Sequence, residues 1–467
     1  MLSTEPKISN SGQKYLAYQD CLSPNQTLFP LTAKVNNRDC LEIGGCDVTT
    51  LVERFGSPLY IVDEVTLRTA CRQYLQGFQT HYPGESRVIY ASKAWNCLAV
   101  SAVVASEGLG FDVVSAGEIH TVLTALDQIN KTAVPIYFHG NNKSSAELEY
   151  AIEHNCIIIV DNWLELENLV KLGENHPETP IPILLRLTPG IECHTHEYIR
   201  TGHLDSKFGF DPHQIEAVFD YVLAHPLLNC LGLHAHIGSQ IFERQPHQDL
   251  AAVLADWFKF GLERGLPLEQ LNVGGGLGIR YLESDDPPSI EEWVQAVSLA
   301  VAKACQERGI AYPLLIAEPG RSLIATACVT AYTVGNRKEI PEIRTYIAVD
   351  GGMSDNPRPI TYQSVYRAVV ANKMSQECQE VVTIAGKHCE SGDILIKDIT
   401  LPKTNPGDIL VVLATGAYNY SMASNYNRLP RPAAVIVHNG EANLILEREN
   451  LADLLRQDRL PNRISLI

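Results

Sequence analysis

Residues 88–94 read Val-Ile-Tyr-Ala-Ser-Lys-Ala. Three apolar residues run into small residues and a single lysine, Lys93, and a helical pattern starts immediately afterwards. A lysine at the end of a buried strand is costly to keep charged. Burial makes a lysine amine a better nucleophile toward a carbonyl. The stretch therefore fits either a Schiff-base lysine or a solvated lysine at a strand end, and the rest of the chain must decide.

Apolar runs of strand length recur along the chain, and helix-like segments separate the early ones. The first five runs start 21 to 26 residues apart, which is the size of one βα unit. Eight such units predict a closed (β/α)8 barrel, that is, a TIM-like α/β fold. A doubly wound open sheet is the alternative, but no GxGxxG fingerprint follows the first strand. The runs are Val88–Ala91, Gly110–Val114, Pro135–Phe138, Cys156–Val160, Pro182–Leu187, Leu228–His234, Leu271–Val273 and Leu314–Ala317.

Polar or glycine-rich residues follow every one of these runs. Active sites of barrels are assembled from the carboxyl ends of the strands. One polar strand end is usually only a cap or a turn, but polar groups at all eight ends indicate a site. They are Lys93, Ser115, His139, Asp161, Arg186, the segment 234–239, the turn 274–276 and the segment 318–321.

Beyond Arg321 the sequence changes to short runs rich in Val, Ile and Thr, separated by turn signals such as Asn439-Gly440. This texture predicts an antiparallel β-sandwich or β-barrel domain. We expect residues 1–35 to form an N-terminal extension and 36–64 the first strands of the β domain. We expect the barrel, with its cofactor, at 65–325 and the rest of the β domain at 326–467.

Composition excludes several classes of protein. The formal net charge of −17 argues against nucleic acid and anionic membranes as partners. The 12 cysteines form no CxxC pair, and the N-terminus has no apolar signal core. These features predict a cytoplasmic protein that crosses no membrane and keeps its thiols reduced.

Two strand ends carry groups suited to an anionic cofactor. The glycine run 274–276 and Gly278 would let backbone N–H groups approach a phosphate, which barrels often hold after strands seven and eight. Glu318 could keep a cofactor ring nitrogen protonated, and Arg321 could clamp a substrate carboxylate. A simple salt bridge between Glu318 and Arg321 is the alternative.

Five histidines fall between positions 194 and 236, and a zinc or iron site is one interpretation of them. No carboxylate or thiolate occurs at matching spacing, so we predict no metal and expect His236 to stack on a flat cofactor. The histidines are His194, His196, His203, His234 and His236.

Cys389 lies in a turn-like stretch of the β domain between His388 and Glu390. A cysteine is ordinarily a small buried hydrophobe. In this setting it is equally well a titrating thiol available for proton transfer.

Together these residues resemble the diaminopimelate decarboxylase family, within the fold-type III pyridoxal-phosphate (PLP) decarboxylases with an alanine racemase-like barrel. The resemblance runs from about Gly44 to Arg431. The matching motifs are YASKAW (90–95), FDVVSAGE (111–118), GNNKS (140–144), THEYIRTG (195–202), SKFGF (206–210), GLHAHIGSQ (232–240), VGGGLG (273–278), EPGR (318–321), CESGD (389–393) and GAYNYSMASNYN (416–427).

The resemblance implies decarboxylation of meso-2,6-diaminopimelate to L-lysine and CO2, the last step of lysine biosynthesis, in a homodimer with shared sites. Lys93 would form the Schiff base with PLP, and His236 would stack on the ring. Glu318 would pair with the ring nitrogen. The implied phosphate and cofactor contacts are Ser239, Gly275, Gly276, Gly278, Gly320, Arg321 and Tyr418; the implied substrate contacts are Arg321, Arg358, Tyr362, Glu390 and Tyr418.

Cys389 would act in proton transfer, and with Glu390 it would reach in from the partner subunit. The sequence departs from the family at Ser92 and Trp95, and Asn356-Pro357 precedes Arg358 where apolar residues are usual. Three alternatives remain. The first is an ornithine or arginine decarboxylase, although eukaryotic-type ornithine enzymes carry aspartate where Glu390 stands. The others are an amino-acid racemase and a non-catalytic PLP-binding homologue.

Overall fold

The computed structural model describes residues 23–131, 134–175, 177–191 and 206–464. These residues form two compact units. The barrel unit comprises 23–27 and 66–325, and the β unit comprises 28–65 and 326–464. His194, His196, His203, the THEYIRTG motif and residues 1–22 lie outside the described residues.

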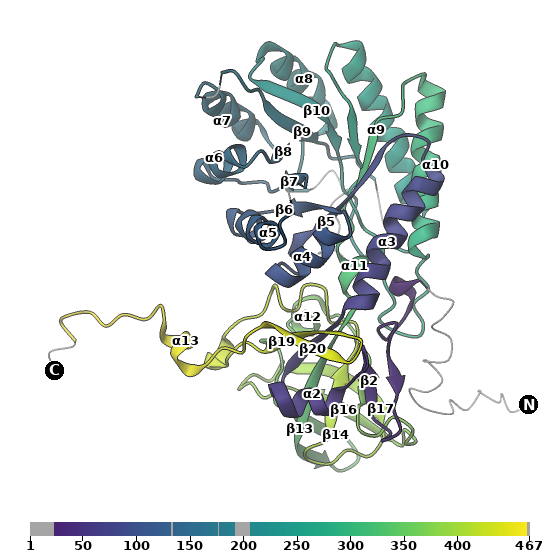
Figure 1. Ribbon diagram of the computed structural model, residues 1–467, viewed down its shortest axis with the longest axis vertical. Helices are drawn as coiled ribbons and strands as arrows, with labels where there is room; N and C mark the ends of the chain where they lie inside the picture. The colour runs from purple at the N-terminus through teal and green to yellow at the C-terminus, as the bar shows by residue number, and fades with distance from the viewer. Residues whose placement is uncertain (1–22, 132–133, 176, 192–205, 465–467) are drawn as a thin grey trace, which may run out of the picture. The chain divides into compact units, whose positions relative to one another are not determined.

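The barrel unit contains a closed barrel of eight parallel strands, which confirms the predicted fold class. Figure 1 shows helices on the outside of these strands. The strands are β5 (Ser86–Ala91), β6 (Gly110–Val113), β7 (Ile136–Phe138), β8 (Ile157–Val160), β9 (Ile181–Arg186), β10 (Leu228–His234), β11 (Gln270–Asn272) and β12 (Leu314–Ala317). The helices are α3 (Glu64–His81), α4 (Leu98–Ser106), α5 (Ala116–Gln128), α6 (Ser145–Glu153), α7 (Trp163–Gly173), α8 (Ile215–Ala224), α9 (Gln245–Glu263), α10 (Ile290–Arg308) and α11 (Arg321–Ile324).

Local sequence explains where the barrel strands and helices begin and end. The strand bodies are buried, and five of their apolar side chains form one cluster: Ile89, Tyr137, Ile159, Leu184 and Ile316. Several helices begin at polar caps that lie just after a strand. Ser115 accepts a hydrogen bond from the Glu118 amide at the start of α5, and Asn162 accepts one from the Glu165 amide at the start of α7. The strand ends therefore pass directly into ordered turns, which hold the polar groups in place.

The β unit is built around a nine-stranded sheet and a separate three-stranded sheet. Most neighbouring strands are antiparallel, as expected, but β14 pairs with β16 and β4 pairs with β19 in parallel. The strands are β1 (Lys34–Val35), β2 (Leu41–Ile43), β3 (Cys46–Asp47), β4 (Leu59–Asp63), β13 (Cys328–Ile340), β14 (Arg344–Val349), β15 (Ala368–Val370), β16 (Glu380–Ala385), β17 (Ile394–Leu401), β18 (Ile409–Val412), β19 (Ala433–His438) and β20 (Glu441–Leu446). The helices are α2 (Val48–Phe55), α12 (Arg358–Tyr362) and α13 (Leu451–Leu455).

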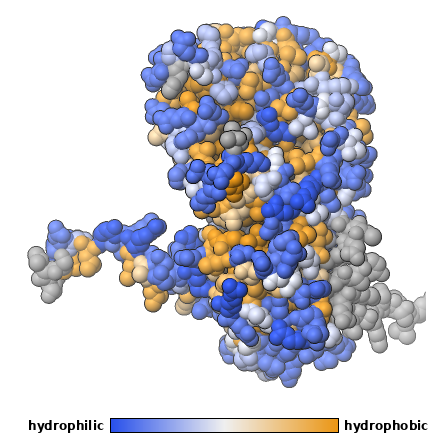
Figure 2. All heavy atoms as spheres, in the orientation of Figure 1, coloured by the Kyte–Doolittle hydropathy of each residue, from blue (hydrophilic) through white to orange (hydrophobic). Residues whose placement is uncertain are grey.

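The C-terminal segment after β20 is largely exposed. Leu451 and Leu460 are each 75% exposed, and Leu455 is 60% exposed. Hydrophobic and hydrophilic atoms both lie on the surface of this segment in Figure 2. None of the helices in the described part of the chain combines the length and apolar character needed to cross a bilayer.

Candidate active site

Lys93 lies in a single 3-10 turn, Ser92–Ala94, directly after β5. Its Nζ donates a hydrogen bond of 2.9 Å to Oδ2 of Asp112, which is fully buried in β6. The lysine side chain itself is 44% exposed, although the strand before it is buried. The turn carries the side chain out of the packed strand, where water remains in reach. The hydrogen bond to the buried carboxylate of Asp112 therefore holds the amine in position.

Glu318 lies just past the end of β12 and is surrounded by nitrogen atoms. Its Oε1 accepts from Asn272 Nδ2 at 2.7 Å and lies 2.9 Å from His139 Nε2, while its Oε2 lies 3.3 Å from His234 Nε2. Burial alone would raise the pKa of Glu318, but the two imidazoles bring that pKa well below its usual range. The group is therefore a buried carboxylate that stays ionised.

His236 follows β10 and is held by the glycine turn. The Gly275 amide donates to its Nδ1 at 3.2 Å. Burial lowers the pKa of His236 well below its usual value, and nearby Lys93 and Arg186 lower it further. The imidazole is therefore neutral, and because Nδ1 accepts, Nε2 carries the proton. A neutral ring of fixed orientation suits a stacking role.

The glycine turn after β11 approaches other backbone segments closely. A Cβ at Gly275 would lie 2.3 Å from the carbonyl oxygen of Glu318, and one at Gly276, whose φ is +123°, would lie 2.8 Å from that of Gly238. The Gly278 amide donates to Ile241. Within the described ranges, the amides of Gly276 and Leu277 have no hydrogen-bond acceptor. Two adjacent amides without acceptors are the kind of group that can bind an anion.

Arg321 begins α11 and is buried beside Ser239. Its guanidinium donates to Ser239 Oγ at 3.0 and 3.2 Å and to the Tyr281 hydroxyl at 2.7 Å. Glu318 and Arg321 therefore bond to different groups, which disfavours the simple salt bridge between them. Gly320 lies close to the turn of Lys93, since a Cβ there would meet Ala91 Cβ at 3.0 Å.

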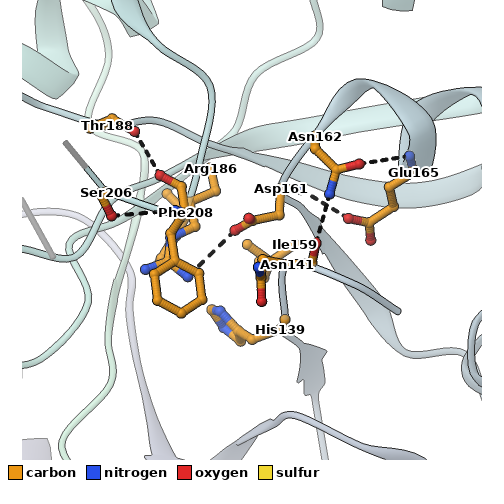
Figure 3. A network of polar contacts seen from close by, with 12 residues as sticks. His139, Asn141, Ile159, Asp161, Asn162, Glu165, Arg186, Thr188, Ser206 and Phe208 are labelled. Carbon is orange, nitrogen blue, oxygen red and sulfur yellow. Dashed lines mark hydrogen bonds and ion pairs between the residues drawn. The ribbon is translucent and has the colours of Figure 1, made fainter. Parts of the chain in front are cut away.

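The ends of β8 and β9 carry a second charged pair (Figure 3). Arg186 Nη1 lies 3.5 Å from Oδ1 of Asp161, and both side chains are buried. The guanidinium also lies over the ring of Phe208, 4.2 Å from its centroid. Burial lowers the pKa of Arg186, and Asp161 opposes that shift. Charged side chains therefore lie at the carboxyl ends of β8 and β9 as well as after β5 and β12.

The expected substrate residues of the β unit form two groups, and Arg358 and Tyr418 belong to the first. Arg358 is buried at the start of α12, where it donates to the Tyr366 hydroxyl at 2.7 Å. Its guanidinium carbon lies 5.8 Å from the ring centroid of Tyr418. Tyr362, at the end of α12, is partly exposed.

Cys389 and Glu390 form the second group, on an exposed turn after β16. The Cys389 amide donates to Asn427 Oδ1 at 2.9 Å, and the Tyr426 hydroxyl lies 3.5 Å from Glu390 Oε2. Beneath the turn, Nδ1 of buried His388 lies 2.6 Å from Oδ2 of Asp393. The turn is thus anchored from below while the thiol and the carboxylate stay accessible.

Donor atoms of His139, His234 and Glu318 lie within 4.8 Å of one another, which is compact enough for a metal ion. The spacing of the histidines gives no hint of this carboxylate, because Glu318 is 84 residues from His234 along the chain. Burial lowers the pKa of His234 to about 4, so its neutral Nε2–H is a donor to the carboxylate. In this arrangement the imidazole nitrogens of His139 and His234 stabilise the negative charge of Glu318.

Sequence reasoning did not assign a role to Asp112, His139, Asn272 or Tyr281. Asp112 is the single polar residue of β6, and that contrast is the signal that could have found it. Asn272 carries no such signal, because Gln270 of the same short strand is polar too. Tyr281 carries no such signal, because it lies in an irregular segment after the glycine turn.

The chain is similar to known proteins over nearly its whole length. The model of the pyridoxal-dependent decarboxylase family, pyridoxal binding domain, matches residues 67–325. Diaminopimelate decarboxylase of Synechocystis sp. is 67% identical over 99% of this chain and 100% of its own length. The chain belongs to the diaminopimelate decarboxylase family.

Two further members are similar over nearly the whole chain. Diaminopimelate decarboxylase of Bacillus subtilis is 45% identical over 91% of this chain and 97% of its own. The crystal structure of diaminopimelate decarboxylase from M. jannaschii in complex with L-lysine superposes with a TM-score of 0.86, at 32% identity, over 95% of this chain and 100% of that one. Membership of the family implies PLP as the cofactor of this chain.

Proposed function

We propose that the chain catalyses the PLP-dependent decarboxylation of meso-2,6-diaminopimelate to L-lysine and CO2, the last step of lysine biosynthesis. The observation that carries the proposal is the set of groups at the barrel mouth: an accessible amine, an ionised buried carboxylate, a neutral imidazole and an anion-binding turn. The 67% identity to a diaminopimelate decarboxylase of the same length supports the choice of substrate.

The residues at the mouth fit PLP. The amides of Gly276 and Leu277 suit a phosphate, with Ser239, Gly275, Gly278 and Gly320 around it. The anionic Glu318 suits a protonated ring nitrogen, and the accessible amine of Lys93 suits the cofactor aldehyde. When bound, PLP supplies an electron sink for the pair of electrons left when CO2 departs.

The chain's own side chains would orient the cofactor ring, keep its nitrogen protonated and transfer protons. Glu318 would hold a proton on the ring nitrogen, because the cluster of His139, His234 and Asn272 keeps it anionic. His236 would hold the ring from one face, and Lys93, anchored by Asp112, would move a proton at its Nζ. Arg321, oriented by Ser239 and Tyr281, would bind a substrate carboxylate.

Substrate selection would fall to the β unit. We propose that Arg358, Tyr362 and Tyr418 bind the carboxylate of the distal amino-acid centre, and that Tyr418 also contacts the cofactor. Glu390 would pair with the distal ammonium, and Cys389 would donate a proton at its Sγ. The family's preference for Glu390 over aspartate separates this reading from an ornithine decarboxylase.

We propose that two chains form a homodimer in which Cys389 and Glu390 complete the site of the second copy. Two observations support it: both residues lie on an exposed, anchored turn, and the C-terminal segment exposes Leu451, Leu455 and Leu460. A cytoplasmic location is also proposed. The ten cysteines in the described ranges are all free, which suits a reducing compartment.

The substrate is tested by giving the purified protein PLP with meso-diaminopimelate, L-ornithine or L-arginine in separate reactions and measuring CO2 and the amine product. We expect CO2 and L-lysine from meso-diaminopimelate alone. Release of CO2 only from ornithine or arginine would assign the chain to the other branch of the family.

The role of Cys389 is tested by Cys389→Ala, with Cys378→Ala as its control. Both cysteines are exposed in the β unit, but only Cys389 lies on the anchored turn. We expect Cys389→Ala to lower kcat about 100-fold, as for the loss of a proton donor, and Cys378→Ala to leave kcat unchanged. Equal kcat for the wild type and Cys389→Ala would remove the thiol from the mechanism.

A further inference from the structure

A short N-terminal segment belongs to the barrel unit although it lies far from the barrel in sequence. This segment, residues 23–27, is called the strap here; it contains a 3-10 turn over Pro24–Gln26. Its neighbours in space are the residues that follow the glycine turn, more than 250 positions along the chain. The decarboxylase family model begins only at residue 67, so it does not cover the strap.

Asn25 is the centre of the strap and is completely buried. Its Nδ2 donates to two carbonyl oxygens, that of Gly278 at 3.1 Å and that of Pro288 at 2.8 Å. Its backbone carbonyl oxygen accepts from the Arg280 amide at 2.9 Å. One residue thus holds the last glycine of the turn and both ends of the loop that leaves it. In a buried site each of these partners would be costly to leave unpaired.

The strap is also anchored at its two ends. Ser23 Oγ donates to Gln73 Oε1 of α3 at 2.7 Å and accepts from the amide of Ile290, the first residue of α10, at 3.3 Å. Gln26 Nε2 donates to the Pro287 carbonyl at 3.0 Å. Two helices of the barrel unit therefore fix the position of Asn25, so that it can hold the turn in place.

The hydrogen bond from Asn25 to Gly278 determines which backbone groups of the turn are available to an anion. The carbonyl oxygen of Gly278 is turned toward a buried amide, and its N–H donates to Ile241. Because both backbone polar groups of Gly278 are occupied, its carbonyl oxygen is directed away from a bound phosphate, which it would repel. The neighbouring amides of Gly276 and Leu277 are the groups left for the anion.

We propose that Asn25 is a positioning residue for phosphate binding: through Gly278 it sets the shape of the turn that holds the phosphate monoester of the cofactor. This inference rests on the proposed function. The strap acts on affinity for the phosphate group and leaves the chemistry at Lys93 and Glu318 untouched.

The test compares PLP with pyridoxal, which lacks the phosphate. Cofactor-free wild type, Asn25→Ala and Gln26→Ala are titrated with each compound, and dissociation constants are measured by fluorescence. We expect Asn25→Ala to weaken PLP binding about tenfold or more, on the scale of one or two lost buried hydrogen bonds, with pyridoxal binding unchanged. Gln26→Ala breaks a strap bond away from the turn and should keep the wild-type ratio of the two constants.

Asn25→Ser is the second variant if Asn25→Ala does not fold, since a hydroxyl retains one donor. The ratio of the pyridoxal dissociation constant to the PLP dissociation constant should fall in both Asn25 variants. An unchanged ratio in the Asn25 variants, or an equal fall in Gln26→Ala, overturns the role of Asn25. A wild-type protein that binds PLP no better than pyridoxal would contradict the phosphate site itself, and with it the proposed function.

Discussion

Glu318 in the barrel unit and Asp355 in the β unit are both buried carboxyl groups, but their surroundings differ. Glu318 lies among two imidazoles and an amide N–H, and its pKa falls well below the usual range. Asp355 accepts from the Tyr332 hydroxyl at 2.5 Å and the Gly352 amide at 2.9 Å. Burial raises the pKa of Asp355 to about 7, against those bonds and helped by Asp393 and Asp350.

The contrast shows what a functional charge requires. Burial penalises a carboxylate in both units, so only the neighbours decide whether the charge survives. The barrel uses His139, His234 and Asn272 to keep one negative charge at its mouth. The β unit lets Asp355 take up a proton and serve as a hydrogen-bonded structural group. Buried groups whose pKa values are shifted by specific neighbours, as in Glu318, are typical of functional sites.

The largest expected effect comes from removing the amine that lies next to the charged cluster. Lys93→Ala should lower CO2 release by about 10⁴-fold or more, since it removes both the attachment point of the cofactor and a proton-transfer group. Borohydride reduction of the PLP-loaded wild type should place the label on Lys93 in peptide mapping. Label on another lysine, at undiminished yield in Lys93→Ala, would mean that the wrong lysine was chosen.

A smaller effect, on stability, is expected for Asp355→Asn. The unfolded Asp355 carboxyl loses its proton near pH 3.8 and the folded one near 7. Between these values the folded state binds more protons, so this group's contribution to stability falls as pH rises, by about 3 kcal/mol from pH 5 to pH 8. Burial also raises the pKa of Glu118 to about 7, so some loss of stability between these pH values is expected in both proteins. Urea unfolding at both pH values should show a loss that is smaller in Asp355→Asn than in the wild type by the contribution of Asp355.

Asp408→Asn is the matched control in the same unit. Lys373, 2.5 Å away, and other hydrogen bonds hold the pKa of Asp408 below its usual value despite burial. The stability from Asp408 is therefore present at neutral pH and lost in acid, and Asp408→Asn should cost stability at pH 8. If Asp355→Asn also loses stability at pH 8 and not in acid, Asp355 and Asp408 do not differ as described.

No effect is expected from removing metal ions. The donor atoms of His139, His234 and Glu318 are close enough for a metal, but they already contact one another in the charge cluster. Dialysis against EDTA with PLP present should leave CO2 release unchanged. Loss of activity that zinc restores would replace the charge cluster with a metal centre.

The comparison also shows how far the sequence could predict the molecule. All eight barrel strands were predicted within a few residues, because buried strands read as continuous apolar runs. In the β unit the sequence gives no clear signal for β15 or β17. β15 has only three residues, and Lys397 and Asp398 interrupt β17, where Asp398 adopts a φ of +55°. The parallel pairings of β14 and β4 join distant segments, and no local pattern encodes them.

The candidate site was predictable where a residue ends a strand and obscure where it lies inside one. Lys93, His236, Glu318 and Arg321 follow strands and stand out. Asp112, which holds the amine, is a strand residue whose meaning depends on the register of the closed barrel. The sequence leaves the exposure of Lys93 open, because it does not show that a one-turn helix, Ser92–Ala94, and not the strand carries the side chain.

The central claim is that the barrel keeps Glu318 ionised for the cofactor ring, and Glu318→Gln tests it most directly. The amide has the same shape but no charge. With PLP bound to equal occupancy, we expect kcat for CO2 release from meso-diaminopimelate to fall about 100-fold, as when one preorganised electrostatic group is lost. An unchanged kcat in Glu318→Gln would contradict the account.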